Sequence, residues 1–126
     1  MQTNKIQIYS HKDLVVWQKG IDLAIVIYNL TSKFPSEEKF GLTAQMRRAV
    51  VSISSNIAEG RSRSTRKDFA QFLHIALGSV SELETQLEIA KRLEYGEKVD
   101  YNGAVATLQE VSKMLVTIIA SLKAKT

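Results

Sequence analysis

Apolar residues recur at steps of three and four along almost the whole chain, which is the spacing of one face of an α-helix. Turn-forming residues divide this pattern, among them Pro35, the only proline. The spacing predicts helices over residues 13–34, 40–59, 65–94 and 100–122, with tails 1–9 and 123–126 frayed. Because the connections are short, consecutive helices should be antiparallel neighbours. The expected fold is one all-α domain, an up-down-up-down four-helix bundle.

The third segment has the most regular pattern, a heptad repeat typical of helical bundles. Thr65 and Asp68 stand three apart before it, which predicts that Thr65 caps this helix. Gly60 and Gly96 stand where the second and third helices should stop on left-handed backbone. The seam residues of the third segment are Phe69, Leu73, Ala76, Val80, Leu83, Leu87 and Ala90. Those of the fourth are Ala104, Leu108, Val111, Leu115, Ile118 and Leu122.

The second segment has a shorter stripe with a polar member. The stripe is Leu42, Met46, Ala49, Ile53 and Asn56. A buried amide in a helical seam usually fixes the register of the helices, which is the favoured reading of Asn56. The other reading is that Asn56 orients the start of the loop that follows.

The first segment carries apolar residues on two opposite sides. One stripe, expected to face the core, is Leu14, Trp17, Ile21, Ala24 and Tyr28. The other stands two residues later, about 200° around the helix, and is Val16, Gly20, Leu23, Ile27 and Leu30. Surfaces tolerate scattered apolar residues, but a second regular stripe indicates a second partner. The pattern predicts a homo-oligomer with Val16, Leu23, Ile27 and Leu30 at the interface.

The residues that usually carry chemistry are sparse. There is no cysteine, and the two histidines, His11 and His74, stand far apart. The chain has no glycine-rich phosphate loop. Glu82, Glu84 and Glu88 could be read as paired carboxylates, but ion pairing with arginines is the commoner reading. We therefore expect no catalysis, no cofactor, no metal and no small-molecule substrate.

The N-terminal residues 1–13 contain no apolar run that could act as a signal peptide. No stretch approaches the ~18 uninterrupted apolar residues of a membrane span. These two observations predict a cytoplasmic protein without a membrane partner.

Positive charge is concentrated in one stretch of the sequence. Residues 47–67 hold six basic residues against one acid, Glu59, and so carry a net charge of +5. The rest of the chain carries −1, which gives the whole chain its net charge of +4. A concentrated basic patch is typical of proteins with a polyanionic partner, and arginine pairs phosphate with two parallel hydrogen bonds. A solvated helix end is the alternative. The candidate contacts are Arg47, Arg48, Arg61, Arg63, Arg66 and Lys67.

Three runs of sequence carry a resemblance to a known family. They are DLVVWQKGIDLAIVIYNLTSKFP, GLTAQMRRAVVSISSNIAEGRSRST and KDFAQFLHIALGSVSELETQLEIA. Together they resemble the bacterial four-helix-bundle family encoded in intervening sequences of 23S ribosomal RNA genes, often labelled a ribosomal protein. They are also similar to the accessory variability determinant of diversity-generating retroelements. The similarity covers about residues 13–95.

The resemblance implies a homopentameric ring, and for the retroelement relatives it implies binding of nucleic acid and of a reverse transcriptase. Arg47 and Arg48 match the family's Arg-Arg-Ala motif, and Arg61 and Arg63 follow by position. We expect a non-catalytic oligomer that binds RNA or DNA by its phosphates, with low sequence specificity. The alternative is a scaffold that docks a larger enzyme such as a reverse transcriptase without touching nucleic acid. A third reading leaves no binding site, with Arg48 paired inside the protein to Glu84 or Glu88.

Overall fold

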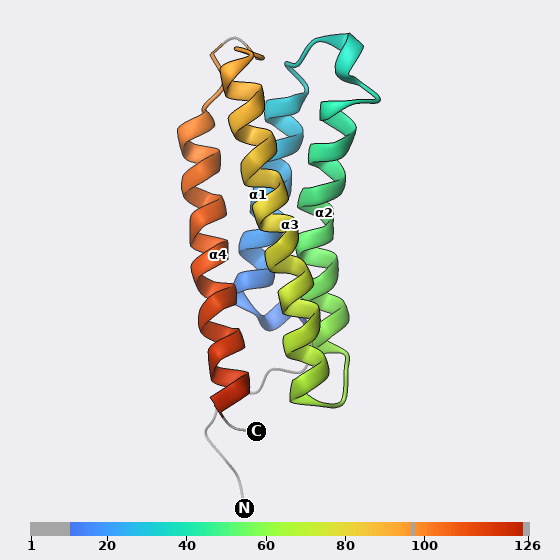
Figure 1. Cartoon of the computed structure of the whole chain (residues 1–126), viewed down its shortest axis with the longest axis vertical. Helices are drawn as coiled ribbons and strands as arrows, with labels where there is room; N and C mark the ends of the chain where they lie inside the picture. Colours follow the sequence, from blue (N-terminus) through green and yellow to red (C-terminus); the bar gives the residue numbers. More distant parts are fainter. Residues whose placement is uncertain (1–10, 97, 125–126) are drawn as a thin grey trace, which may run out of the picture.

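The structure, a computed structural model, describes residues 11–96 and 98–124. Four helices run alternately up and down along one long axis, and no strand occurs in the described residues (Figure 1). Their bounds are Val15–Thr31 for α1, Leu42–Arg61 for α2, Arg66–Arg92 for α3 and Tyr101–Ala124 for α4. Short 3-10 helices occupy His11–Asp13 and Ser36–Glu38. The all-α four-helix fold that the sequence predicts is confirmed.

The connections lie at the two ends of the bundle. The α1–α2 and α3–α4 connections share one end, and the α2–α3 turn lies at the other, beside the start of α1 and the end of α4 (Figure 1). The end of α4 is longer than the sequence predicts, because Lys123 and Ala124 belong to the helix and not to a tail. The frayed tail predicted over residues 1–9 lies outside the described residues.

The seams predicted for α3 and α4 form one side of the core. Every α3 seam residue is at most 5% exposed except Phe69, which is half-buried. In α4 the buried stripe shifts by one residue near its end, so that Ile119 is buried and Ile118 only half-buried. The shift follows from helix geometry, because a strict seven-residue repeat drifts about 20° per heptad around a straight helix.

The two faces of α1 are the reverse of the prediction. Val16, Leu23, Ile27 and Leu30, predicted at a subunit interface, are at most 5% exposed within the single chain and pack in its core. Of the stripe predicted to face the core, Leu14, Trp17 and Ala24 are half-buried at the edge of the core, whereas Ile21 and Tyr28 are 37% and 40% exposed. The interface assignment is therefore wrong, since side chains already buried in their own bundle cannot meet a sister chain.

Small residues bring α1 and α2 close together. Gly20 lies in the buried stripe of α1, and a Cβ added to it would come within 2.5 Å of the Ser54 hydroxyl on α2. The Asn56 side chain of α2 is half-buried and donates to the Ser52 backbone oxygen at 2.8 Å. Ser79 of α3 donates to the Ser52 hydroxyl at 2.9 Å. Asn56 therefore belongs to a polar contact line between α2 and α3, in agreement with a structural role.

The start of α3 agrees with the sequence prediction, whereas α2 and α3 do not end at the glycines predicted to stop them. The Thr65 cap of α3 is confirmed, since its hydroxyl accepts from the Asp68 amide at 3.1 Å. Gly60, however, lies inside α2, and its lack of a side chain lets Phe69 and Phe72 of α3 approach. Gly96 does take left-handed backbone, with φ of 74°, but α3 already ends at Arg92, because Glu94 is left-handed as well, with φ of 57°.

Glu38 joins the two connections at the far end of the bundle. One of its carboxylate oxygens accepts from the Leu42 amide at 2.9 Å, and the other accepts from the Tyr95 hydroxyl at 2.7 Å. These hydrogen bonds, the backbone one foremost, lower the pKa of Glu38. The bond to Glu38 in turn raises the pKa of Tyr95.

By length and composition α4 could cross a membrane. Here it packs as one of four bundle helices and buries Ala104, Leu108, Val111 and Leu115. Core helices of soluble proteins can be equally long and apolar, so length and composition do not by themselves indicate a membrane span. The cytoplasmic location stays a prediction.

Candidate nucleic-acid interface

The six candidate basic residues do not form one patch. Arg48 lies near the start of α2 and Arg61 at its end, which puts their backbones about 20 Å apart at ~1.5 Å per residue. Arg47 and Arg48 are therefore near the end that holds the α1–α2 connection, whereas Arg61, Arg63, Arg66 and Lys67 lie around the α2–α3 turn (Figure 1). We call the end with the α2–α3 turn the basic end.

Arg47 acts inside the fold. Its Nε donates to the Thr31 hydroxyl at 3.0 Å, and its Nη2 donates to the Tyr28 backbone oxygen at 3.2 Å. The guanidinium also lies 4.5 Å from the centre of the Tyr28 ring. The Tyr28 oxygen also accepts from the Ser32 amide at 3.1 Å, so Arg47 adds a donor from α2 at the last turn of α1 and ties the two helices together. These contacts occupy the fork that a phosphate would need.

Arg48 is exposed and makes no hydrogen bond or ion pair with the described part of the chain. The ion pair that the sequence left open, between Arg48 and Glu84 or Glu88, is absent there. Glu88 instead accepts from Arg92 one turn later at 2.8 Å, and this hydrogen bond lowers the pKa of Glu88. A lowered pKa is unsuited to a general acid at neutral pH.

Four of the six candidates lie at the basic end. Arg61 ends α2, Arg63 lies in the turn, and Arg66 and Lys67 begin α3. Arg63 pairs with Glu59 at 2.5 Å and lies 4.7 Å from the centre of the Phe72 ring, so it is partly committed to its own chain. Arg61 is half-buried, whereas Arg66 and Lys67 are exposed at the start of α3. The long alkyl stems of arginine and lysine let their charges project into solvent from such positions.

A groove of about 360 Å³ runs between the start of α3 and the end of α4 at this end. Cations from both helices line it, together with apolar and uncharged polar side chains. The lining residues are Arg66, Lys67, Ala70, Gln71, His74, Leu122 and Lys123. No carboxylate is among them, so the groove is positively charged and suited to an anion.

Sequence reasoning finds only two members of this groove, Arg66 and Lys67. It misses Gln71 and His74, which stand one and two helical turns beyond Lys67 on the same face of α3. It also misses Lys123, which was placed in the C-terminal tail. The positions 67, 71 and 74 could have been grouped by their helical spacing, but the approach of Lys123 depends on the tertiary fold.

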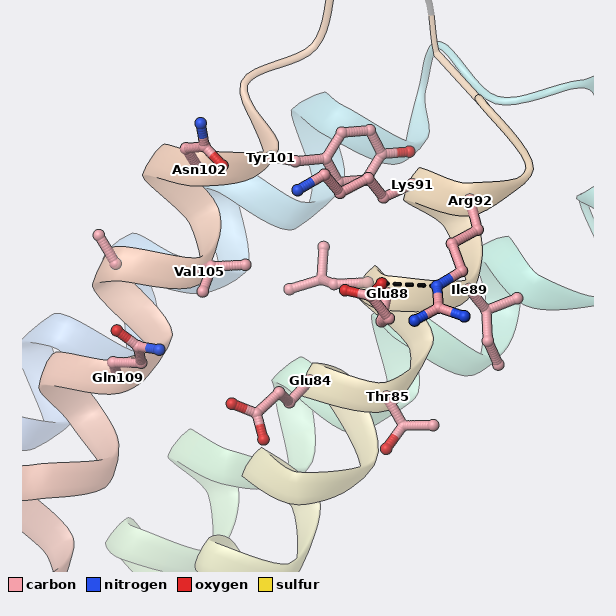
Figure 2. A pocket seen from close by; sticks show the side chains of 12 residues that line it. Glu84, Thr85, Glu88, Ile89, Lys91, Arg92, Tyr101, Asn102, Val105 and Gln109 are labelled. Atoms are coloured by element: carbon pink, nitrogen blue, oxygen red, sulfur yellow. Dashed lines mark hydrogen bonds and ion pairs between the residues drawn. The ribbon is translucent and has the colours of Figure 1, made fainter.

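A larger hollow lies elsewhere, toward the opposite end of the same two helices. It holds about 700 Å³ between the second half of α3 and the first half of α4. Figure 2 shows Glu84 and Glu88 on its α3 side, facing Tyr101, Val105 and Gln109 on α4. The two carboxylates offset the charges of Lys91 and Arg92 in its walls, so this hollow has no net positive charge and is a poor candidate for nucleic acid.

The same hollow shows little of the chemistry of an active site. Burial raises the pKa of Tyr101 to about 12, and its hydroxyl donates to the Tyr95 backbone oxygen at 2.7 Å. Glu88 is held by Arg92, as Figure 2 shows. Among the described residues no three His, Asp or Glu side chains gather as a metal would require. The absence of catalysis stays a prediction.

Comparisons with known proteins agree on one family. The family model described as 23S rRNA-intervening sequence protein matches residues 12–117. A crystal structure of a protein with unknown function, of the S23 ribosomal protein family from Bacteroides thetaiotaomicron, is 34% identical, with a TM-score of 0.76. The match covers 84% of this chain and 96% of that one. Among curated proteins none matches this chain.

Proposed function

This chain belongs to the 23S rRNA-intervening sequence protein family, and from that premise we propose that it binds RNA or DNA by the phosphates at its basic end, without catalysis. The observation that carries the proposal is the groove between α3 and α4, in which Arg66, Lys67 and Lys123 meet without a carboxylate. Cations that converge from two helices attract a polyanion more strongly than the same charges spread over a surface. Arg47, which serves the fold, is no longer a contact in this proposal.

The ligand should be held with little regard to sequence. Phosphate contacts position a nucleic acid but do not read its bases. Within the groove no phenylalanine, tyrosine or tryptophan is available for base stacking, and Phe72 nearby is covered by Arg63. The affinity should therefore be steeply dependent on salt and tolerant of sequence.

Self-association is a second part of the proposal, by a different face from the one that the sequence suggested. Ile21, Ile25 and Tyr28 are 37%, 58% and 40% exposed on the outside of α1. Val51, 44% exposed, stands one turn after Arg47 on α2, on the side that touches Tyr28. An oligomer joined here would repeat the basic end in every subunit, and multivalency raises a weak affinity if one strand spans several ends.

A second candidate is a scaffold that docks a larger protein such as a reverse transcriptase. The observation that favours it is the hollow in Figure 2, because it combines apolar walls with charges of both signs. Such a surface suits a protein partner better than a strand of uniform negative charge.

The test is the salt dependence of binding to a fluorescent single-stranded RNA of about 20 nucleotides. The triple variant Arg66→Gln, Lys67→Gln, Lys123→Gln removes the charges of the groove. Each lost phosphate contact makes the slope of log affinity against log salt shallower by about 0.7. We expect a slope shallower by about 2 and an affinity lower by an order of magnitude or more at about 150 mM salt.

The matched control removes three exposed cations from the opposite end, by Lys39→Gln, Arg48→Gln and Lys91→Gln. Its overall charge equals that of the groove variant, so it reports the effect of charge alone. If both variants lose the same slope, the basic end has no special role. If the unchanged protein does not bind even at about 50 mM salt, the scaffold is favoured.

A further inference from the structure

Exposed apolar side chains occur on two opposite sides of the bundle. Because α1 contacts α2 and α4, and α3 contacts the same two helices, the side formed by α1 and α2 lies opposite the side formed by α3 and α4. The exposed apolar residues of the α1–α2 side include Ile21, Ile25, Tyr28 and Val51, which we call the apolar ridge. A cluster of this kind on a protein surface marks a contact with a partner.

The α3–α4 side carries a groove in the middle of the two helices. It holds about 370 Å³ and joins the hollow of Figure 2, with which it shares Glu84 and Gln109. Val80 and Leu108 belong to its lining. Val116, 52% exposed, stands seven residues after Gln109 and extends the apolar surface along the same face of α4. We call this hollow the central groove.

The apolar ridge and the central groove lie at the same height along the bundle. Ser52 of α2 and Ser79 of α3 are joined by a hydrogen bond of 2.9 Å, which fixes the alignment of these antiparallel helices. Arg48 stands four residues before Ser52, about 6 Å from this bond along the axis. Glu84 stands five residues after Ser79, about 7.5 Å from the bond in the same direction. The Tyr28 ring is level with both, since the arginine before Arg48 lies 4.5 Å from its centre.

Charged groups of opposite sign accompany the two surfaces. Arg48 stands three residues before Val51, on the same side of α2, and makes no hydrogen bond or ion pair with the described residues. Glu82 and Glu84 of α3 are exposed and likewise have no such contact in the described part of the chain. With Lys113, the cation of the central groove, these two carboxylates leave the α3–α4 side a net charge of −2 + 1 = −1 at this height.

We propose that the apolar ridge of one copy of the chain packs against the central groove of a second copy, with Arg48 of the first copy between Glu82 and Glu84 of the second. The inference rests on the proposed self-association and names the surface that receives the ridge. Equal heights let two copies stand side by side without sliding along the axis. Because the two surfaces differ, each copy uses its ridge toward one neighbour and its groove toward another.

The charges of the contact give the first test, with mass measured by light scattering in the absence of RNA. Arg48→Glu, and the double variant Glu82→Lys, Glu84→Lys, each place like charges across the contact and should weaken association by about tenfold or more. The chain with all three substitutions restores opposite charges and should associate as the unchanged chain does. Circular dichroism checks that each variant is folded.

Lys98→Glu is the matched control for Arg48→Glu. It makes the same change of charge at an exposed residue, but near the start of α4, in a hollow between α1 and α4 that belongs to neither surface. Association of this variant should equal that of the unchanged chain. Since Arg48→Gln also weakens the contact, a variant that carries it is compared for RNA affinity at a concentration where it is assembled as the unchanged chain is.

A mixing experiment tests whether a ridge meets a groove. Ile25→Asp disrupts the apolar ridge, and Gln109→Trp fills the central groove. Each variant alone should stay a monomer, whereas a mixture offers one intact ridge and one intact groove and should form pairs and nothing larger. If ridges pack on ridges, Gln109→Trp alone associates as the unchanged chain does, and the proposal is overturned.

The outcomes separate this contact from the other proposals. A monomer at the highest soluble concentration overturns the proposed self-association together with this contact. Association that ignores both charge variants, or that the combined variant does not restore, overturns the pairing of ridge and groove alone. A loss of RNA affinity in the groove variant of the basic end, with unchanged mass, supports the basic end as a site independent of this contact.

Discussion

The replacement of Gly60 by alanine tests the close packing that shapes the basic end. A Cβ at this position would lie 2.8 Å from the Phe72 Cβ, 3.0 Å from the Phe69 ring and 3.2 Å from the Phe69 backbone oxygen. Ordinary contacts between carbon atoms are about 3.5–4.0 Å. The Phe72 Cβ and the Phe69 oxygen are fixed to the backbone of α3, so no side-chain rotation relieves the overlap.

The magnitude follows from two opposing terms. Replacing glycine by alanine inside a helix stabilises by about 0.8–1.0 kcal/mol. Forcing a methyl group into a packed interface costs about 1–3 kcal/mol, and here α3 must move by several tenths of an ångström. We expect a net loss of up to about 2 kcal/mol, which lowers the melting temperature of a chain of this size by up to roughly 8 °C.

The control is the same substitution at Gly78, in the exposed face of α3. A Cβ there meets nothing within 4 Å. Gly78→Ala should therefore show the helix term alone and raise the free energy of unfolding by about 0.5–1 kcal/mol.

The assay is urea unfolding followed by circular dichroism, for both variants and the unchanged chain. The two substitutions have the same chemistry and should have effects of opposite sign. If Gly60→Ala stabilises the chain as Gly78→Ala does, then α2 and α3 do not approach as closely as the structure indicates, and the position of the turn that follows Gly60 would need revision.

Three further predictions concern the core, the far end of the bundle and Arg47. Leu23→Ala should lower the free energy of unfolding in urea by about 2–5 kcal/mol, because Leu23 is buried. Ile21→Ala should lower it by less than about 1 kcal/mol, because Ile21 lies outside. Equal losses would contradict the observed faces of α1. The pKa of Glu38 is below its unfolded value of 4.5, so the stability it contributes is present above about pH 4.5 and is lost as the pH falls further. The melting temperature of Glu38→Gln should accordingly lie below that of the unchanged chain at pH 7, and the gap should close by about pH 3; a constant gap refutes the bridging role. Arg47→Gln should cost about 1–2 kcal/mol of stability, since the hydrogen bonds of Arg47 are charge-assisted. It should leave the affinity for the fluorescent RNA within about twofold of the unchanged chain. A tenfold loss of affinity in the folded variant would return Arg47 to the binding site.

The helices themselves could be predicted from the sequence because the apolar spacing is continuous through each of them. The α3 seam and the Thr65 cap are local patterns, and local patterns depend little on the rest of the fold. The stop predicted at Gly60 is wrong for the opposite reason. A glycine that permits close approach of another helix and a glycine that ends its own helix look alike in sequence.

The inverted faces of α1 have a physical explanation. Both stripes are apolar, so the hydrophobic pattern alone does not say which one faces inward. The polar residues do: Gln18, Asp22 and Asn29 lie on one side of the helix, about 200° from Val16, Gly20 and Ile27 respectively. Polar side chains favour water, so the side opposite them should be the buried one.

The split of the basic segment follows from helix length. Thirteen residues separate Arg48 from Arg61, and in a helix they span about 20 Å, so one basic stretch of sequence becomes two regions of surface. The contribution of Lys123 depends on how α4 packs against α3. No spacing along the chain relates residue 123 to residue 67.

Binding of nucleic acid at the basic end is best tested by finding where RNA lies on the protein. Backbone amide shifts should be followed by nuclear magnetic resonance while a short single-stranded RNA is added at about 50 mM salt. The largest shifts should fall on residues 61–74 and on the end of α4, with residues 42–48 little changed. Shifts centred on the hollow around Glu84 and Tyr101, or on Arg47 and Arg48, would contradict binding at the basic end.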